Sequence, residues 1–516
     1  MKVRSRLFLV ASLALAGCEA PDGSGRVGTG ASRRPNIVFI FSDDHATAAI
    51  GCYGSRINST PHIDRLAAEG VVFENAFCTN SICAPSRAVI LTGKHSHLNG
   101  VPDNVASFDG NQATFPRLLR AAGYQTALIG KWHLKSDPTG FDYWDILPGQ
   151  GEYYSPDFKT AEGRRREKGY VTDVITDLTL RWLREERDPS RPFLLMSQHK
   201  APHRSWMPGP DHLAGIDGGE VPEPATLFDD YRGRSDAARD QAMEIGRHMY
   251  PEYDLKLARE PADAPAEGPD RWAPSLVERM SPDEQAAWNA AFASGNQAFR
   301  AADLEGRELV RWKYQRYIKS YLGCVASIDD NIGRLLECLD DEGLTGNTIV
   351  VYSSDQGFFL GEHGWYDKRF MYEPSLRMPL VVRWPAVVEA GTRRAELVQN
   401  LDFAQTLLDV AGVPAAPEMQ GASLLPLLRG NVPEDWRESV YYEYFERAVH
   451  SVALHRGVRT QRYKLIHFHE LGQWELYDLE RDPEEVDNLY GQPRLESVQR
   501  ELEEELARLM KACGRT

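Results

Sequence analysis

Short apolar segments of strand type alternate with helical patterns along most of the chain. The segment NIVFIF at 36–41 is a continuous aliphatic and aromatic run, which is typical of a strand buried on both faces. A helical pattern follows at 60–70, with Thr60 as its cap, Pro61 in its first turn and Gly70 at its end. Further strands are predicted at 71–77, 124–131, 192–199, 348–355 and 378–385, and further helices at 114–123, 173–187 and 308–341. This alternation predicts an α/β fold with a large, mostly parallel sheet between helices.

The N-terminal residues have the pattern of an export signal. Basic residues precede an apolar run that is too short to span a bilayer, and small residues lead to Cys18. We therefore predict a signal peptide at 1–18 and a location in the periplasm or at the cell surface. Leu15–Cys18 resembles a bacterial lipobox, which favours a lipid anchor on Cys18, and a plain signal peptide is the alternative. Residues 19–34 are rich in Gly, Ser and charge and predict a flexible linker.

The remaining residues divide into a main domain and a small C-terminal domain. The main domain is predicted at 35–430, and within it residues 205–300 are rich in Pro, Gly, Ala and acidic residues, with weak helical patterns. We expect this segment to be an insertion near the mouth of the site. After about residue 430, strand patterns precede an amphipathic helical pattern at 496–514, so residues 431–516 predict a small α+β domain with an antiparallel sheet.

The charge of the chain excludes some partners. The formal net charge is −16, whereas proteins that bind nucleic-acid backbones present an excess of Lys and Arg. We therefore expect no nucleic-acid partner, and membrane contact only through the lipid anchor. An anionic substrate would need a local basic pocket in such an acidic chain.

Polar side chains follow four of the predicted strands. The carboxyl ends of parallel strands meet at one edge of a sheet, where active sites of this fold class lie. We therefore expect these residues to form a site. They are Asp43 and Asp44 at the end of the first strand, Lys131 and His133 at the end of the strand at 124–131, His199 and His203 at the end of the strand at 192–199, and Asp355 and Gln356 at the end of the strand at 348–355.

The acidic members of this set suit a metal ion. Adjacent carboxylates such as Asp43 and Asp44 repel each other unless a cation compensates, and Asp355 with the amide oxygen of Gln356 completes a set of oxygen ligands. Such a set favours Ca²⁺ or Mg²⁺ over zinc. The alternative for two neighbouring aspartates alone is a simple loop cap.

The segment CAPSRAVILTG at 83–93 carries a family resemblance. Cys83-Ala84-Pro85-Ser86-Arg87 matches every position of the C-x-P-S-R signature of type I sulfatases. The segments NIVFIFSDD, GYQTALIGKWH, HKAPH and SSDQGFFLGEHGWYDKR and the C-terminal RYKLIHF and ELYDLERDPEEVDNL are also similar to that family, so the resemblance spans nearly the whole mature chain. Bacterial N-acetylglucosamine-6-sulfatases and mucin-desulfating sulfatases are the most similar subtype.

The resemblance implies an alkaline-phosphatase-like sandwich and a hydrolase that removes sulfate from a sulfated glycan, with 6-O-sulfated N-acetylglucosamine as the expected unit. It also implies that a formylglycine-generating or anaerobic sulfatase-maturating enzyme oxidises Cys83 to formylglycine. The implied metal is Ca²⁺ rather than Mg²⁺, and its implied ligands are Asp43, Asp44, Asp355, Gln356 and residue 83. The family often has Asn where this chain has Gln356.

The resemblance also implies roles for the basic residues. Arg87 is implied to hold the formylglycine and to help anchor the metal site, and Lys131 and Lys368 to bind the sulfate oxygens. His133 is implied to remove a proton from the hydrated aldehyde, and His203, with Lys368, to protonate the leaving alcohol. Pro85 independently places residue 83 just ahead of a helix N-terminus, where the helix dipole attracts an anion.

Three alternatives stay open from the sequence. Iduronate-2-sulfatases and arylsulfatases share much of the same core pattern. A phosphonate or phosphodiester hydrolase would use similar chemistry, and turnover of aryl phosphate diesters against aryl sulfates would distinguish it. A glycan-binding surface lipoprotein would leave Cys83 unmodified and would have no need of the proton-transfer residues.

Overall fold

The computed structural model describes residues 34–261, 263–447 and 452–515. The predicted signal peptide, Cys18 and all of the predicted linker except Arg34 lie outside the described residues. In the part of the chain that is described, no helix combines the length and the hydrophobicity that a membrane crossing requires.

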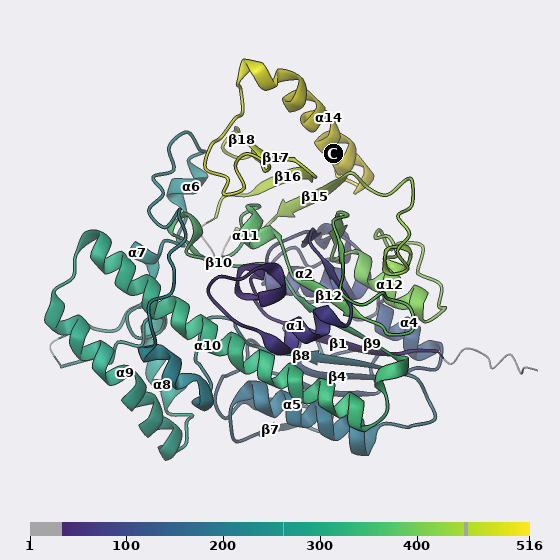
Figure 1. Ribbon diagram of the computed structural model, residues 1–516, viewed down its shortest axis with the longest axis horizontal. Helices are drawn as coiled ribbons and strands as arrows, with labels where there is room; N and C mark the ends of the chain where they lie inside the picture. The colour runs from purple at the N-terminus through teal and green to yellow at the C-terminus, as the bar shows by residue number, and fades with distance from the viewer. Residues whose placement is uncertain (1–33, 262, 448–451, 516) are drawn as a thin grey trace, which may run out of the picture. The chain divides into compact units, whose positions relative to one another are not determined.

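A mixed sheet of ten strands forms the centre of the fold (Figure 1). Five neighbouring strands in its middle, β9, β1, β8, β4 and β5, are all parallel to one another, which confirms the predicted parallel arrangement. β12 and β6 pair antiparallel with the two outer members of this group. In sheet order the strands are β13 (Thr392–Arg394), β2 (Val71–Phe73), β12 (Leu380–Arg383), β9 (Thr348–Ser354), β1 (Asn36–Ser42), β8 (Phe193–Gln198), β4 (Gln125–Lys131), β5 (Tyr143–Leu147), β6 (Asp157–Lys159) and β7 (Arg164–Arg166).

The prediction of a single strand at 71–77 is wrong. The structure divides it into β2 and β3 (Ala76–Phe77), because the two halves pair with different partners. β2 pairs with β12 and β13 in the large sheet, whereas β3 pairs with β14 (Val398–Gln399) in a separate two-stranded sheet. Glu74, between the halves, donates its N–H to the carbonyl of Arg394 at 2.8 Å.

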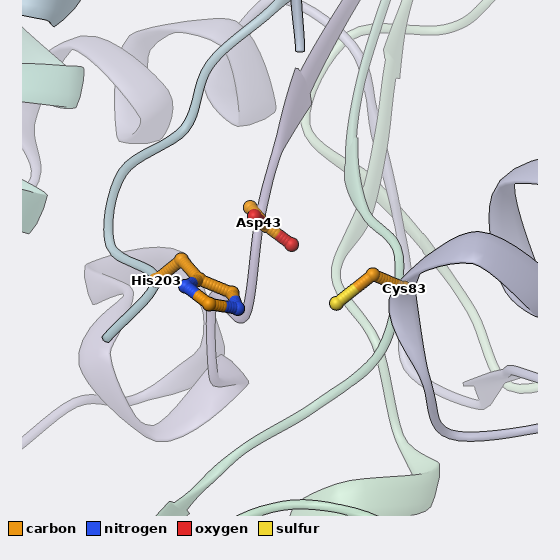
Figure 2. Close-up of side chains that lie close together, drawn as sticks. All are labelled: Asp43, Cys83 and His203. Atoms are coloured by element: carbon orange, nitrogen blue, oxygen red, sulfur yellow. The ribbon is translucent and has the colours of Figure 1, made fainter. Parts of the chain in front are cut away.

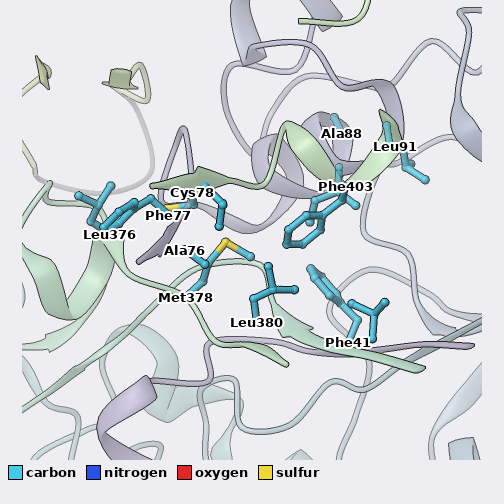
Figure 3. Packing of buried hydrophobic residues seen from close by; sticks show 14 of the residues in the cluster. Phe41, Ala76, Phe77, Cys78, Ala88, Leu91, Leu376, Met378, Leu380 and Phe403 are labelled. Carbon is cyan, nitrogen blue, oxygen red and sulfur yellow. The ribbon is translucent and has the colours of Figure 1, made fainter. Parts of the chain in front are cut away.

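Both faces of the sheet are covered by helices, as predicted. Ile37, Phe39 and Phe41 of β1 point into one apolar core, and the intervening Val38 and Ile40 point into another. Figure 3 shows the first core, in which Phe41 lies near Phe403 of α12, and to which Ala88 and Leu91 of α2 also belong. The first face is covered by α2 (Cys83–Thr92), α4 (Phe115–Ala121) and α12 (Asp402–Val410), and the second by α1 (Pro61–Ala68), α5 (Val171–Arg181) and α10 (Gly306–Asp341).

Helix α1 begins at Pro61, as the sequence predicts, but its cap differs from the prediction. The side chain of Thr60 makes no capping hydrogen bond. Instead, the carboxylate of Asp329 in α10 accepts hydrogen bonds from the backbone N–H groups of His62 at 3.1 Å and Ile63 at 2.8 Å. An acid from a helix that is distant in the sequence therefore satisfies the free N–H groups of α1 and joins the two helices.

The segment at 205–300 contains a longer helix than its weak helical patterns predicted. Helix α9 (Pro282–Ala302) starts with a capping box in which Ser281 and Glu284 bond to each other's backbone N–H groups. The segment is tied to the end of the β8 loop, where Arg204 donates two hydrogen bonds to Asp254 at 2.7 and 2.6 Å. It also contacts the segment before Lys368, because Tyr366 donates its O–H to the carbonyl of His248 at 2.9 Å.

The C-terminal residues form the predicted antiparallel sheet and closing helix. β15 (Ser439–Tyr444), β16 (His455–Thr460), β17 (Tyr463–Phe468) and β18 (Gln473–Asp478) pair in chain order. Leu502 and Leu506 of α14 (Glu496–Ala512) pack into one cluster with Val458 and Leu465 of the sheet. The remaining short elements are α3 (Ser96–Asn99), α6 (Ala237–Asp240), α7 (Ile245–His248), α8 (Ala273–Val277), α11 (Glu373–Leu376), α13 (Leu425–Leu428), β10 (Phe359–Leu360) and β11 (Tyr366–Asp367).

Candidate active site

The polar residues predicted at the four strand ends lie at one edge of the large sheet. The four strands are neighbours in the order β9, β1, β8, β4, so their carboxyl ends meet. The loops after β1 and β8 are joined directly, because the N–H of Asp43 donates to the carbonyl of Ala201 at 3.2 Å and the N–H of His199 donates to the carbonyl of Phe41 at 2.7 Å. Asp44 and His133 both have positive φ, at 68° and 58°, a conformation that non-glycine residues adopt rarely and that gathers at functional sites.

Cys83 faces these strand ends from the first turn of α2. The helix begins at Cys83 itself, after the extended residue Ile82, so the cysteine lies at the helix N-terminus rather than ahead of it. The thiol is 1% exposed, and its Sγ lies 3.3 Å from the Nζ of Lys368. Burial raises the pKa of the Cys83 thiol to about 12, an effect that Lys368 opposes. Figure 2 shows Cys83, Asp43 and His203 directed toward one another, and their potential ligand atoms lie within 4.8 Å of one another.

Three buried acids form the centre of the site. One carboxylate oxygen from each of Asp43, Asp44 and Asp355 lies within 4.8 Å of the other two. The backbone N–H of Asp44 donates to Oδ1 of Asp355 at 3.0 Å. Burial raises the pKa of Asp44 to about 6, Lys368 lowers it and Asp355 raises it. Three carboxylates this close are stable only where positive charge surrounds them.

The free oxygens of the acidic cluster fit a hard cation. Among the described residues, no donor reaches the buried Oδ1 of Asp43, Oδ2 of Asp44 or Oε1 of Gln356. Buried oxygens without donors are costly, and anionic and amide oxygens are the ligands that Ca²⁺ and Mg²⁺ take in proteins. The donor set at 43, 44, 355 and 356 therefore suits such an ion.

Three basic side chains surround the acids. Arg87 donates Nε to Oδ2 of Asp355 at 3.2 Å, and its Nη2 lies 3.6 Å from Oδ1 of Asp43. Lys131 pairs with Asp43. Lys368 pairs with Asp44. Burial lowers the pKa of Lys368, but the negative charge of Asp44 outweighs this effect and leaves the pKa raised. Arg87 bonds to Asp355, to Gln198 and to the backbone carbonyl of Lys131, so it helps to hold the acids in place.

The two histidines lie on the more exposed side of the site. Nδ1 of His203 lies 2.6 Å from the carbonyl oxygen of Arg204, which assigns the proton to Nδ1. Its Nε2 lies 3.8 Å from Oδ2 of Asp44, and the side chain is 15% exposed. Burial first, and then Lys131, lower the pKa of both His203 and His133 well below the ordinary value. Both imidazoles are therefore neutral before an anion arrives.

Several residues near the site were not singled out by the sequence. Gln198, the last residue of β8, accepts a hydrogen bond from Nη1 of Arg87 at 2.8 Å. Gln150, in the loop after β5, accepts one from Nζ of Lys131 at 2.5 Å. Lys200 is a further buried residue in the segment HKAPH. The strand-end position could have identified Gln198, whereas Gln150 follows no sequence pattern.

The protein class follows from the whole chain. The Sulfatase family model matches residues 35–413, and the model of the C-terminal part of N-sulphoglucosamine sulphohydrolase matches residues 361–512. The chain belongs to the sulfatase family and is a sulfatase. The alternative of a non-enzymatic glycan-binding protein is therefore set aside.

The chain is also similar to individual sulfatases. An N-acetylglucosamine-6-O-sulfatase from Bacteroides thetaiotaomicron is 48% identical over 96% of this chain and 88% of that protein. The N-acetylglucosamine-6-sulfatase of Homo sapiens is 28% identical over 84% of this chain and 70% of its own. A solved structure in complex with its substrate D-glucosamine-2-N,6-O-disulfate has a TM-score of 0.90 and 48% identity, and the match covers 93% of this chain and 98% of that chain.

Proposed function

We propose that the protein hydrolyses the 6-O-sulfate ester of a glucosamine unit, N-acetylated or N-sulfated, in a glycosaminoglycan or mucin glycan. The observation that carries the proposal is the placement of Cys83 in one cluster with Asp43, His203 and Lys368. The sugar is inferred from the relatives that act on N-acetylglucosamine 6-sulfate or bind a glucosamine disulfate.

The nucleophile in this proposal is residue 83 after conversion to formylglycine by a maturation enzyme. A hydrated aldehyde supplies one hydroxyl that attacks sulfur and a second whose deprotonation releases the sulfate. The buried, neutral thiol of Cys83 is a poor nucleophile as it stands, because the thiolate is the reactive form of cysteine. The N-terminus of α2 adds a partial positive charge where the anionic ester would bind.

The cation in this proposal is Ca²⁺. Asp43, Asp44, Asp355 and Gln356, with residue 83, would hold it, and it would supply Lewis acidity toward a sulfate oxygen. Ca²⁺ accepts six to eight oxygen ligands in flexible geometry, whereas Mg²⁺ demands a strict octahedron and retains waters. A set with three carboxylates and the longer side chain of Gln356 suits the larger ion.

The basic residues divide into anion binding and proton transfer. In this proposal Lys131 and Lys368 bind the sulfate oxygens and Arg87 positions the acids, and their contacts with Asp43, Asp44 and Asp355 support these roles. His133 would remove the proton from the hydrated aldehyde. Nε2 of His203 would protonate the leaving alcohol with the help of Lys368, and a bound sulfate would offset the lysine charges that lower the pKa of this histidine.

We also propose that the protein is exported and lipid-anchored on Cys18, at the periplasmic or outer face of a bacterial membrane. The support is the sequence pattern of residues 1–18.

A substrate panel tests the reaction and the sugar. The purified, matured protein is incubated with N-acetylglucosamine 6-sulfate, an iduronate 2-sulfate disaccharide, 4-nitrophenyl sulfate and phenyl phosphonate esters, and released sulfate or phosphonate is measured by ion chromatography. We expect kcat/KM for the 6-sulfated sugar to exceed that for every other compound by at least about 100-fold, since a site built to hydrogen-bond one substrate rejects analogues that lack its polar groups. A preference for phosphonates, or for iduronate 2-sulfate, would contradict the proposal.

Replacing His203 by asparagine tests the proton donor. Loss of general acid catalysis lowers kcat by about 10²- to 10⁴-fold when the leaving group is a sugar alcohol. The same change should lower kcat for 4-nitrophenyl sulfate by less than about fivefold, because nitrophenolate leaves without a proton. The matched control is His199→Asn, which changes the other histidine of the segment. Equal losses on both substrates would show that His203 acts in some other way.

A further inference from the structure

Lys200 is a buried cation that the proposed mechanism does not use. It follows β8 between His199 and His203, its side chain is 4% exposed, and its backbone carbonyl accepts the N–H of His203 at 3.1 Å. Its Nζ lies 4.8 Å from the centre of the Tyr153 ring. Within residues 34–261, 263–447 and 452–515, no oxygen accepts a hydrogen bond from this ammonium group, and the group is not sealed from solvent. The N–H groups of this largely buried ammonium therefore have no protein acceptor and are available to water or to an anionic ligand.

Lys256 is a second buried lysine, with a structural role, and it provides a comparison for the hydrogen bonding of Lys200. It is also buried, and burial lowers its pKa to about 8, as it does for Lys200. The ammonium of Lys256, however, donates to the backbone carbonyls of Ser205 and Tyr253. Lys200 has only the ring of Tyr153, and a cation over an aromatic ring still has N–H groups free for an anion.

The charges around Lys200 place it beside the sulfate-binding residues. Burial lowers the pKa of Lys131 most, and the positive charge of Lys200 lowers it next. The charge of Lys200 also lowers the pKa of His203. Glu152 and Asp44 act on Lys200 in the opposite direction. Because Lys131 and Lys368 already face the acids, Lys200 is an additional positive charge beyond those needed for one sulfate monoanion.

We propose that Lys200 is the centre of a second anion subsite, which binds an acidic substituent of the substrate other than the sulfate that is cleaved. This inference rests on the proposed function. The acidic substituent is an N-sulfate on the same glucosamine or the carboxylate of a neighbouring uronic acid. Tyr153 forms the base of this subsite, and Glu152, at its edge, weakens its positive potential.

The experiment compares substrates that differ in the second anion. Wild type and Lys200→Met are assayed with N-acetylglucosamine 6-sulfate, with D-glucosamine-2-N,6-O-disulfate and with a disaccharide of uronic acid and N-acetylglucosamine 6-sulfate. We expect Lys200→Met to raise KM by about 10- to 100-fold for the disulfate, the disaccharide or both, as for a lost charge-assisted hydrogen bond. For N-acetylglucosamine 6-sulfate the change should stay below about threefold. A raised KM for the disulfate would identify the N-sulfate as the second anion, and a raised KM for the disaccharide would identify the uronic acid carboxylate.

A second variant keeps the proposal testable if Lys200→Met does not fold. Glu152→Gln removes the opposing charge, so it should lower KM for the affected substrate and leave N-acetylglucosamine 6-sulfate unchanged. Lys319→Met on α10, whose ammonium donates to the carbonyl of Gly218, is the control. Equal effects of Lys200→Met on all three substrates, or no effect on any, would overturn the subsite. Failure of the proposed function differs, because wild type would then release sulfate from none of the three sugars.

Discussion

Replacing Cys83 by alanine is expected to lower kcat/KM for sulfate release by at least about 10⁵-fold, the size of loss that follows removal of a catalytic nucleophile. Lys131, Lys368 and His203 stay in place in this variant, so it should still bind the sulfated sugar. Peptide mass spectrometry of the wild type provides the reference. We expect the fragment with residue 83 to be lighter than its thiol form by about 18 Da, the change from –CH₂SH to –CHO.

Replacing Cys83 by serine separates attack on sulfur from release of sulfate. A serine hydroxyl at this position has no second hydroxyl to expel the sulfate, so one turnover should leave a sulfate ester on the protein and add about 80 Da. Cys52→Ser is the control, since Cys52 is only half-buried and lies outside the site. It should keep full activity. Full activity of Cys83→Ala would show that residue 83 is not the nucleophile.

The sequence predicts the central part of the fold because burial on both faces leaves a local signal. β1, β8 and β9 in the middle of the sheet contain continuous apolar runs, as in NIVFIF. β5 belongs to the same parallel group but has Asp145 in its middle, and the sequence predicts no strand there. The break of the predicted strand at 71–77 could not be seen, because it depends on pairing with β13 and β14, more than 300 residues later. The cap of α1 has the same cause, since Asp329 reaches it from α10.

The site is predictable to the extent that its residues end strands. Lys131 ends a strand of the parallel group, and Asp43 and Asp355 each follow one directly, so the topology brings them together. Lys368 does not lie at the end of a strand of the parallel group, and only the family resemblance identified it. Lys200 lies inside a segment that the sequence singled out, but its missing hydrogen-bond acceptor is a property of the folded surroundings and has no counterpart in the sequence.

Removal of the cation is expected to abolish activity. Dialysis of the wild type against a calcium chelator should lower kcat/KM by at least about 10³-fold, and added Ca²⁺ should restore it, because the ion would neutralise developing charge on the sulfate. Asp44→Asn should give a similar loss that Ca²⁺ does not restore. Asp44 is the chosen position because its Oδ2 is buried and has no donor among the described residues, while its other oxygen faces Lys368 and Gln356.

Thermal unfolding provides a readout of the cation that is independent of activity. A ligand that binds only the folded state stabilises it by about 2.7 kcal/mol at a concentration of 100 times its Kd, so Ca²⁺ should raise the unfolding midpoint of the chelator-treated wild type. In Asp44→Asn the rise should be much smaller, whereas Asp341→Asn should keep it, since Asp341 is an exposed acid outside the cluster at 43, 44 and 355. A wild type whose activity and unfolding midpoint are both indifferent to chelation would refute the metal site, and the three buried carboxylates would then have to be balanced by Arg87, Lys131 and Lys368 alone.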